Sequence, residues 1–298
     1  MDPVIEYVAN YMDVSIDPVS WARRREEQGW HVLSVADHFF TPTRAFPHVW
    51  VTASAVAMAT SRVRVTTAFV NNLFRSPVEV AQAALMMQTV AGGRFELGLG
   101  AGWARDEIEA AGMSYPVARD RAGAFIESVQ IIRSLLHNGC CSFKGDYYTV
   151  EVPKLGPICP VPPPLVCSVG GPRTVREVTP HADRVEIKAS SPTTRGGTLD
   201  MAAMAGISDR HLIEMIELVR AVNPRIGLGM FVFCNVGDDQ RTRDLSALMG
   251  GGLYSRFYGS PQKVAEGLAW LAELGITRCQ ISPIDDGSFD RLAPVLFG

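Results

Sequence analysis

The amino-acid sequence predicts an α/β fold, a (β/α)8 or TIM barrel, built as a single domain over residues 1–298. Short apolar segments alternate with segments of helical period, which is typical of a parallel sheet covered by helices. Eight such apolar segments are present, and eight strand-helix units close naturally into a barrel. A length of 298 residues also suits one domain of this kind.

The expected strands are apolar runs, several rich in β-branched residues, that are bounded by Gly, Pro or polar clusters. The run RVRVTTAFV and the run RFELGLG are two examples. In chain order the eight strands are expected at residues 4–10, 30–36, 62–70, 94–100, 164–170, 183–189, 225–236 and 276–283.

The expected helices are recognised by apolar residues at helical spacing and by residues that start or stop helices. Pro77, Ser208 and the Ser260-Pro261 pair each stand at a predicted start, and Gly275 stands at a predicted end. The helices are expected at residues 20–29, 47–61, 77–93, 118–139, 173–182, 208–222, 260–275 and 288–297, with helix and loop at 238–252.

Two segments interrupt the alternation. Residues 139–164 hold Lys144-Gly145-Asp146 between β-branched and aromatic residues and then become Pro-rich, which predicts an inserted hairpin and a connector. Residues 189–206 are rich in Ser, Thr and Gly and predict a mobile loop over the C-terminal mouth of the barrel. A further loop is expected at residues 101–116.

Composition and charge narrow the possible partners and location. The formal net charge is -3 and no dense basic run is present, so we expect no nucleic-acid partner. No apolar run reaches the roughly 20 residues that span a bilayer, and the first residues lack the regions of a signal peptide. These features predict a cytoplasmic protein with no membrane partner.

Several chemistries find no support in the sequence. The six cysteines are scattered, and we expect the adjacent Cys140 and Cys141 to be structural, with a redox role as the alternative. There is no GxSxG, HExxH, P-loop or metal-spaced His motif, so serine hydrolysis, zinc proteolysis and P-loop phosphate transfer are not expected. No metal site is predicted.

The stretch LSVADHFF places Asp37 and His38 directly after the second strand. Polar residues just past the C-terminal end of a barrel strand face the active-site mouth. His38 is of the side-chain type that titrates near neutral pH, so it is a candidate to donate or accept a proton. The alternative is that Asp37 caps the following turn and His38 bonds to the backbone.

Three further segments are candidates for ligand contacts at the mouth. The alternating glycines of LGLGAGW, among them Gly100 and Gly102, allow a flat or anionic ligand to approach the backbone, or else allow tight packing. The segment VGGPRT forms either an anion site completed by Arg173 or an ordinary turn. Asn71 and Asn72 follow the third strand and either bind polar ring edges or cap turns.

With these segments in one order, the chain resembles the bacterial luciferase-like family. The segments that carry the likeness are DHFF, TAFVNNLFRSPVEVAQAALMMQTVAGGRFELGLGAGW and VGGPRT, with GSPQKVAEGLAWLAELGI as a looser match. The resemblance extends from Val4 to about Pro283. Within the family, the chain is most similar to oxidoreductases that use coenzyme F420, the 8-hydroxy-5-deazaflavin.

The resemblance implies a flavin-like ring at the C-terminal mouth, with Asp37 and His38 near its reactive part and His38 acting in catalysis. It implies a non-prolyl cis peptide bond between Ala68 and Phe69 that supports the ring. It also directs Glu107 toward the ring or substrate. The cofactor contacts expected in total are Asp37, Ala68, Phe69, Asn71, Asn72, Gly100, Ala101, Gly102, Gly170 and Gly171.

The expected reaction is hydride transfer between coenzyme F420 and a small organic substrate, in either direction, with His38 handling the proton and Asp37 orienting His38. An FMN-dependent monooxygenase is the alternative enzyme, and a non-catalytic flavin-binding module is the alternative of another class. A homodimer is expected through residues 51–60 and 79–87, unless these helices simply pack on the barrel. Residues 40–47 and 189–206 are expected to set the substrate.

Overall fold

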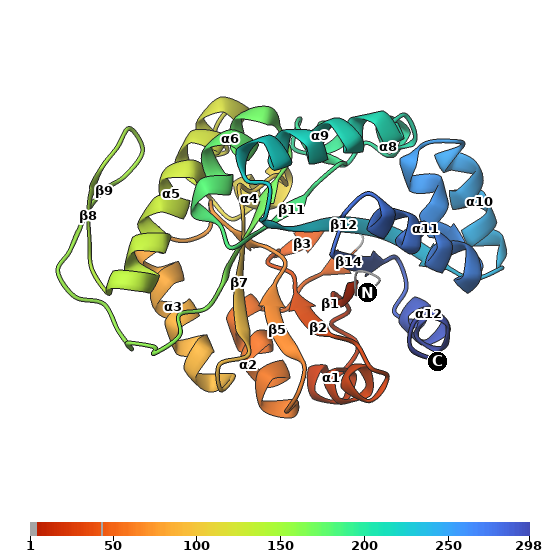
Figure 1. The fold of residues 1–298 in the computed structure, drawn as a ribbon, viewed down its shortest axis with the longest axis horizontal. Coiled ribbons are helices and arrows are strands. Elements are labelled where there is room, and N and C mark those ends of the chain that lie inside the picture. Colours follow the sequence, from red (N-terminus) through yellow and green to blue (C-terminus); the bar gives the residue numbers. More distant parts are fainter. Residues whose placement is uncertain (1–4, 43) are drawn as a thin grey trace.

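The computed structural model describes residues 5–42 and 44–298, so Val4 of the first expected strand and Thr43 of the loop 40–47 lie outside the described residues. Parallel strands surround one central barrel (Figure 1). Around the ring they are β10 (Leu165–Val169), β11 (Arg184–Ile187), β12 (Gly227–Val236), β14 (Arg278–Pro283), β1 (Glu6–Tyr11), β2 (Val32–Val35), β5 (Arg64–Thr67) and β7 (Phe95–Gly100). Because β10 also pairs with β7, the ring is closed, and the predicted barrel is confirmed.

The helices that surround the barrel lie near the expected residue ranges (Figure 1). They are α1 (Pro18–Glu27), α2 (Val49–Ala59), α3 (Pro77–Val90), α5 (Ala118–Asn138), α6 (Pro172–Val178), α9 (Asp209–Val222), α10 (Gln240–Met249), α11 (Pro261–Glu273) and α12 (Gly287–Phe297). The predicted caps are confirmed, since the side chains of Ser208 and Ser260 accept hydrogen bonds from backbone amides of the first turn.

The inserted hairpin is also confirmed. Strands β8 (Cys141–Lys144) and β9 (Thr149–Val152) pair antiparallel and extend beyond α5 at the left of Figure 1. The side chain of Glu127 on α5 accepts three backbone hydrogen bonds from Asp146, Tyr147 and Tyr148, which attaches the hairpin turn to the barrel.

Two expected loops contain helices instead. Residues 101–116 include α4 (Arg105–Ala110), and residues 189–206 include α7 (Ser191–Thr194) and α8 (Met201–Ala205). Helix α8 begins where the Asp200 side chain accepts a hydrogen bond from the Ala203 amide. Such short helices span less than two turns, so their apolar residues show no period that composition alone would reveal.

The remaining short elements lie at the rim of the barrel or beside its strands. Strand β6 (Val70–Asn71) continues along β7 beyond the end of β5, and β13 (Tyr258–Gly259) pairs with β12. Strands β3 (Phe40–Thr41) and β4 (Arg44–Ala45) form a small hairpin within the loop 40–47. Two 3-10 helices occupy Thr179–His181 and Leu253–Phe257.

Ion pairs close the N-terminal end of the barrel. The buried guanidinium of Arg278 donates to Glu96 at 2.5 and 3.0 Å and to Glu6 at 2.9 Å. Arg64 and Arg184, at the starts of β5 and β11, pair with Glu6, and the buried carboxyl of Glu186 lies in the same charged surroundings. Because this end is filled, a ligand site within the barrel belongs at the opposite, C-terminal end.

Across residues 5–42 and 44–298, no helix combines the length and the apolar character that a membrane span requires. The cysteines are all within the described part of the chain, and none of them forms a disulfide there.

Candidate functional site

His38 and Glu107 form a hydrogen-bonded pair at the C-terminal mouth. His38 follows β2 and its side chain is 19% exposed, whereas Glu107 lies on α4 with its side chain 1% exposed. The Nδ1 atom of His38 is 2.6 Å from Oε1 of Glu107, and the Phe39 amide donates to Oε2 at 2.8 Å. With Nδ1 engaged, Nε2 is the ring nitrogen left to exchange a proton with a ligand.

Asp37 has a different role from the one expected. Its buried carboxylate accepts hydrogen bonds from the Asn71 amide at 2.8 Å and from Nη1 of Arg75 at 2.6 Å. The ring of His38 is therefore oriented by Glu107, and Asp37 instead fixes the chain that follows β5. Consecutive residues at a strand end point to opposite sides, which separates Asp37 from the imidazole of its neighbour.

The peptide bond between Ala68 and Phe69 is cis, as expected. The Phe69 ring packs against the backbone of β7, where Gly98 and Gly100 leave room for it. A Cβ atom added at Gly98 would overlap the Thr67 carbonyl oxygen and lie 3.2 Å from Phe69, and one at Gly100 would also lie 3.2 Å from Phe69. Close packing of two chain segments thus accounts for these two glycines.

The segment after Phe69 is packed in a similar way. Gly102 has φ of +80° and faces the Asn71 side chain and Leu73. Asn71 also caps its own turn, because its Oδ1 atom accepts a hydrogen bond from the Leu73 amide at 3.0 Å. Asn72 is buried and donates to the Tyr148 hydroxyl at 3.5 Å. Cofactor contacts of Asn71, Asn72, Gly100, Ala101 and Gly102 stay predictions.

Gly170 and Gly171 lie between β10 and α6, but Arg173 is not directed at them. Its Nε atom pairs with Glu177 at 3.0 Å, and its Nη1 atom donates to the Arg119 carbonyl at 3.1 Å. A Cβ at Gly170 would overlap Ser191, whereas a Cβ at Gly171 would meet nothing within 4 Å. The open space therefore lies in front of Gly171.

Side chains that the sequence reading did not select also lie at the mouth. The centroid of the His38 ring is 5.7 Å from that of the Trp103 ring and 5.1 Å from that of the Phe46 ring. The Nζ atom of Lys188 lies 5.1 Å from the centroid of the Trp103 ring, and burial lowers the pKa of Lys188 to about 8. Lys188 stands at the end of an expected strand, which is the signal that would have found it.

Two phenylalanines extend the aromatic lining along β12. Phe231 lies 6.4 Å from the Phe69 ring and 4.9 Å from the Phe233 ring, measured between centroids. All three side chains are only partly buried, so flat apolar faces remain at the mouth. A planar, largely apolar ring is the kind of ligand that such faces suit.

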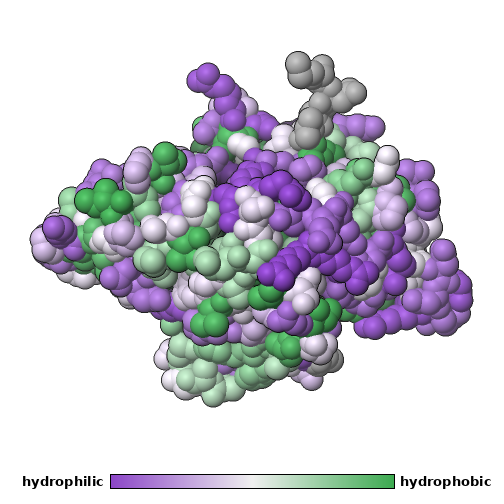
Figure 2. Space-filling view, turned by 90° about the horizontal axis from the view of Figure 1, so that it is seen from below, coloured by the Kyte–Doolittle hydropathy of each residue, from purple (hydrophilic) through white to green (hydrophobic). Residues whose placement is uncertain are grey.

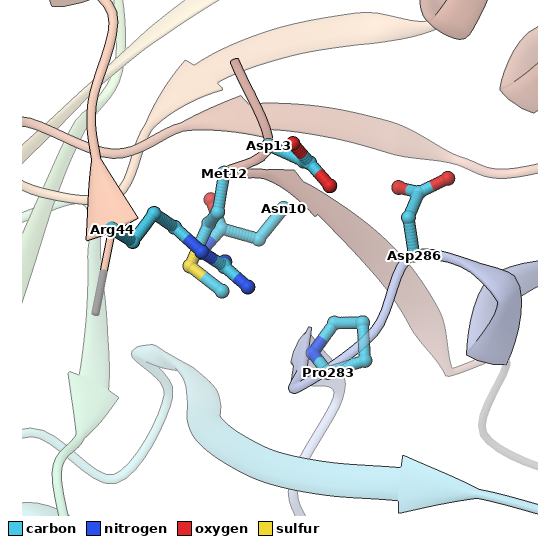
Figure 3. A pocket seen from close by; sticks show the side chains of 6 residues that line it. All are labelled: Asn10, Met12, Asp13, Arg44, Pro283 and Asp286. Atoms are coloured by element: carbon cyan, nitrogen blue, oxygen red, sulfur yellow. The ribbon is translucent and has the colours of Figure 1, made fainter. Parts of the chain in front are cut away.

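A small recess lies between the ends of β1 and β14 (Figure 3), lined by Asn10, Met12, Asp13, Arg44, Pro283 and Asp286. Its charged groups are engaged within the chain. Arg44 donates to the Ile284 carbonyl at 3.0 Å, and Asp286 accepts from the Trp21 indole at 2.7 Å. The part of the chain that the structure describes holds no group of three His, Cys, Asp or Glu side chains arranged to bind a metal.

The fold and the site place this chain among the (β/α)8-barrel proteins, with a His-Glu pair at the C-terminal mouth of the barrel. Comparison with known proteins shows to which family of such proteins the chain belongs. A family model described as luciferase-like monooxygenase matches residues 17–262, and the chain therefore belongs to that family.

Two relatives by sequence are F420-dependent glucose-6-phosphate dehydrogenases. Over 160 residues the chain is 36% identical to an F420-dependent glucose-6-phosphate dehydrogenase of Amycolatopsis mediterranei, a match that covers 52% of this chain and 48% of that one. It is 32% identical over 169 residues to the protein of the same name from Kineococcus radiotolerans, covering 55% and 48%. The chain thus spans about half the length of the curated relatives it matches.

Solved structures share the whole fold at low sequence identity. An F420-dependent secondary alcohol dehydrogenase in complex with an F420-acetone adduct superposes with a TM-score of 0.76 at 19% identity, covering 99% of this chain and 98% of that one. The monooxygenase RslO1 from Streptomyces bottropensis superposes with a TM-score of 0.73 at 17% identity, covering 98% and 96%. Both similarities concern the fold.

Proposed function

We propose that this protein is an oxidoreductase that transfers a hydride between coenzyme F420 and a small organic substrate. The observation that carries the proposal is the His38-Glu107 pair at the mouth of a luciferase-like barrel. Such a pair can move a proton beside a hydride transfer. The matched relatives are named as F420-dependent dehydrogenases, which supports this cofactor over FMN.

The residues at the mouth fit a deazaflavin. The partly exposed rings of Phe69 and Phe231 offer apolar faces for a planar ring system, and the space in front of Gly171 is open for a polar tail. Asp37 would hold the ring-binding segment in place through Asn71 and Arg75. The proposed cofactor contacts are those that the family resemblance implies, namely Asp37, Ala68, Phe69, Asn71, Asn72, Gly100, Ala101, Gly102, Gly170 and Gly171.

When bound, the cofactor would supply or accept the hydride. His38 would donate a proton from Nε2 to the substrate oxygen during reduction, or accept it during oxidation. Glu107 would hold the imidazole through Nδ1 and stabilise its positive charge. The rings of Trp103 and Phe46 would limit the access of water to His38.

A parallel titration with oxidised F420 and with FMN tests the proposal, using quenching of tryptophan fluorescence. We expect saturable binding of F420 and much weaker binding of FMN, with His38→Asn binding F420 as the native protein does but failing to exchange a hydride. Tighter binding of FMN would support the monooxygenase instead. Binding of F420 without any hydride exchange by the native protein would support a non-catalytic module, and binding of neither cofactor would overturn both enzyme functions.

We also propose that the protein forms a homodimer in the cytoplasm. Val51 and Met58 on α2 and Met86 on α3 are 69%, 73% and 49% exposed. Residues coloured as hydrophobic gather over part of the face that Figure 2 shows from below. Val51→Glu with Met58→Glu should give a monomer in light scattering after gel filtration. The control is Ile158→Glu, at an 81% exposed position in the connector. An unchanged mass in the double variant would contradict this interface.

A further inference from the structure

We propose that Lys188 binds a negatively charged oxygen group of the substrate, such as a carboxylate or a phosphate, beside Trp103. The inference rests on the proposed function, since it names the substrate class for the same site. It assigns the two ends of a small anionic substrate to two side chains. His38 handles the proton at the reacting end, and Lys188 holds the charged end.

The first support is the position of Lys188 in the barrel. It follows Ile187, the last residue of β11, and its amide donates to the Val169 carbonyl at 2.8 Å, so its backbone is tied to β10. Glu186, two residues earlier, faces the barrel interior, where a Cβ at Gly229 would lie 2.7 Å from it. Side chains alternate along a strand, so Lys188 points to the same interior one layer nearer the mouth.

The second support is the shared neighbour. The Trp103 ring lies 5.1 Å from Nζ of Lys188 and 5.7 Å from the ring of His38. One indole is thus flanked by a cation and by the proton-handling side chain. The Trp103 carbonyl accepts a hydrogen bond from the Tyr115 hydroxyl at 2.9 Å, which helps to hold this loop in place. A ligand beside Trp103 would be in reach of both groups.

The third support is the lack of a counter-charge. Within residues 5–42 and 44–298, no carboxylate forms an ion pair with Lys188, and its Nζ atom makes no hydrogen bond there. Two carboxylates at this end of the barrel are engaged elsewhere: Glu107 by His38 and the Phe39 amide, and Asp37 by Arg75 and the Asn71 amide. The ammonium group of Lys263, in contrast to that of Lys188, donates hydrogen bonds to the Ser246 hydroxyl and to the Tyr258 carbonyl. An unpaired ammonium in a partly buried position at the mouth can bind an anionic group of a ligand through a charge-assisted hydrogen bond.

A ligand anion would pair with this ammonium group. Burial lowers the pKa of Lys188 to about 8, so the side chain is still mostly protonated at neutral pH and can attract an anion. Cofactor phosphate is the rival source of the same chemistry, because Gly170 and Gly171 lie near the end of the neighbouring strand β10. The experiment therefore measures cofactor and small-anion binding separately.

Anion binding is measured by calorimetry with inorganic phosphate and with malonate, and F420 binding by fluorescence, on the native protein and on Lys188→Met. We expect the variant to bind the small anions at least about tenfold more weakly, as for one charge-assisted hydrogen bond, with the affinity for F420 unchanged. Lys188→Arg should retain most of the anion affinity. Lys144→Met, in the exposed end of the hairpin, is the matched control and should behave as the native protein.

Nuclear magnetic resonance gives a readout that needs no turnover. The sequence holds four lysines, Lys144, Lys154, Lys188 and Lys263, so reductive methylation with carbon-13 yields a simple spectrum. The signal missing in Lys188→Met identifies Lys188, and phosphate should raise the pH at which it titrates. Unchanged anion binding in Lys188→Met, or a selective loss of F420 binding, would overturn the inference. Failure of the native protein to bind F420 would instead overturn the proposed cofactor, and the anion measurements would still decide on Lys188.

Discussion

Glu107 connects the candidate proton carrier to the end of β2. One carboxylate oxygen lies 2.6 Å from Nδ1 of His38, and the other accepts a hydrogen bond from the Phe39 amide at 2.8 Å. A buried carboxylate with both oxygens engaged fixes the plane of the imidazole. On this view Glu107 is a positioning residue, and His38 is the group that meets the substrate.

Replacing Glu107 with Gln keeps the size of the side chain and removes its charge. We expect kcat for the proposed reaction to fall about 10- to 100-fold, within the range of general acid–base catalysis, with a changed pH profile and an unchanged affinity for F420. The control is Glu109→Gln, on the exposed side of the same helix. Steady-state rates of both variants are measured against pH. Equal pH profiles for Glu107→Gln and Glu109→Gln would contradict the role of Glu107 as a positioning residue.

At this scale, the sequence analysis selected both His38 and Glu107 but did not pair them, and it expected Asp37 to orient His38. The position of His38 follows from a general rule about barrel strands. Its partner comes from a residue 69 positions later on a helix too short to show a period, and Asp37 was the nearer choice. Lys188 and Trp103 were overlooked for a related reason, since only the folded chain brings the ends of different strands together.

At the scale of elements, the chain that leaves β5 packs against the end of β7. Gly98 makes this possible, because any side chain there would overlap the Thr67 carbonyl. The hydroxyl of Thr67 also donates to the Gly98 carbonyl at 2.8 Å, and the Gly98 amide donates back to that hydroxyl at 3.0 Å. This contact positions Phe69, one of the aromatic faces of the candidate site.

Gly98→Ala should therefore displace the segment around Thr67 and destabilise the protein. Overpacking of this kind costs about 1 to 3 kcal/mol, which lowers the midpoint of thermal unfolding by several degrees. Gly251→Ala is the control, because a Cβ there meets nothing within 4 Å. Thermal unfolding followed by circular dichroism measures both, and equal midpoints for the two variants would be evidence against the packing described.

The barrel strands and the long helices could be predicted from the sequence, whereas the short helices at the mouth could not. Strands of the barrel wall and helices such as α5 and α11 carry period and caps in their own residues. The helices α4, α7 and α8 depend on contacts at the mouth, such as the buried side of Glu107 and Ile108 on α4. The glycines of β7 were open to two interpretations because sequence does not tell whether a ligand or another segment of chain fills the space.

At the scale of the whole molecule, the two ends of the barrel differ in charge chemistry. The N-terminal end is filled by interlinked ion pairs around Arg278, whereas the C-terminal end holds Lys188 without a paired carboxylate among the described residues. Buried ion pairs contribute little net stability but leave a large penalty if one partner is lost. The ion pairs at the N-terminal end therefore hold the barrel strands together, and the C-terminal end is the one that can bind a ligand.

Glu186 makes the stability of this barrel depend on pH. Burial raises its pKa from 4.5 to about 7, although Arg278 and Arg184 oppose the shift. The folded state then binds a proton that the unfolded state has lost, so the free energy of unfolding should fall as pH rises from about 4.5 to 7.

Glu186→Gln should lose this part of the pH dependence, so the variant gains stability relative to the native protein between about pH 5 and pH 8. Unfolding midpoints across this range measure the effect, with Glu217→Gln on the exposed side of α9 as the control. A difference between Glu186→Gln and the native protein that stays constant with pH would argue against a raised pKa.

The central claim is that the C-terminal mouth binds coenzyme F420 with its ring beside His38 and Phe69. The most direct measurement is a crystal structure of the protein with oxidised F420. The account predicts that the deazaflavin ring contacts the chain around Ala68 and Phe69 and faces Nε2 of His38, with the tail toward Gly171. A ring bound elsewhere, or crystals that take up FMN at this position and exclude F420, would contradict it.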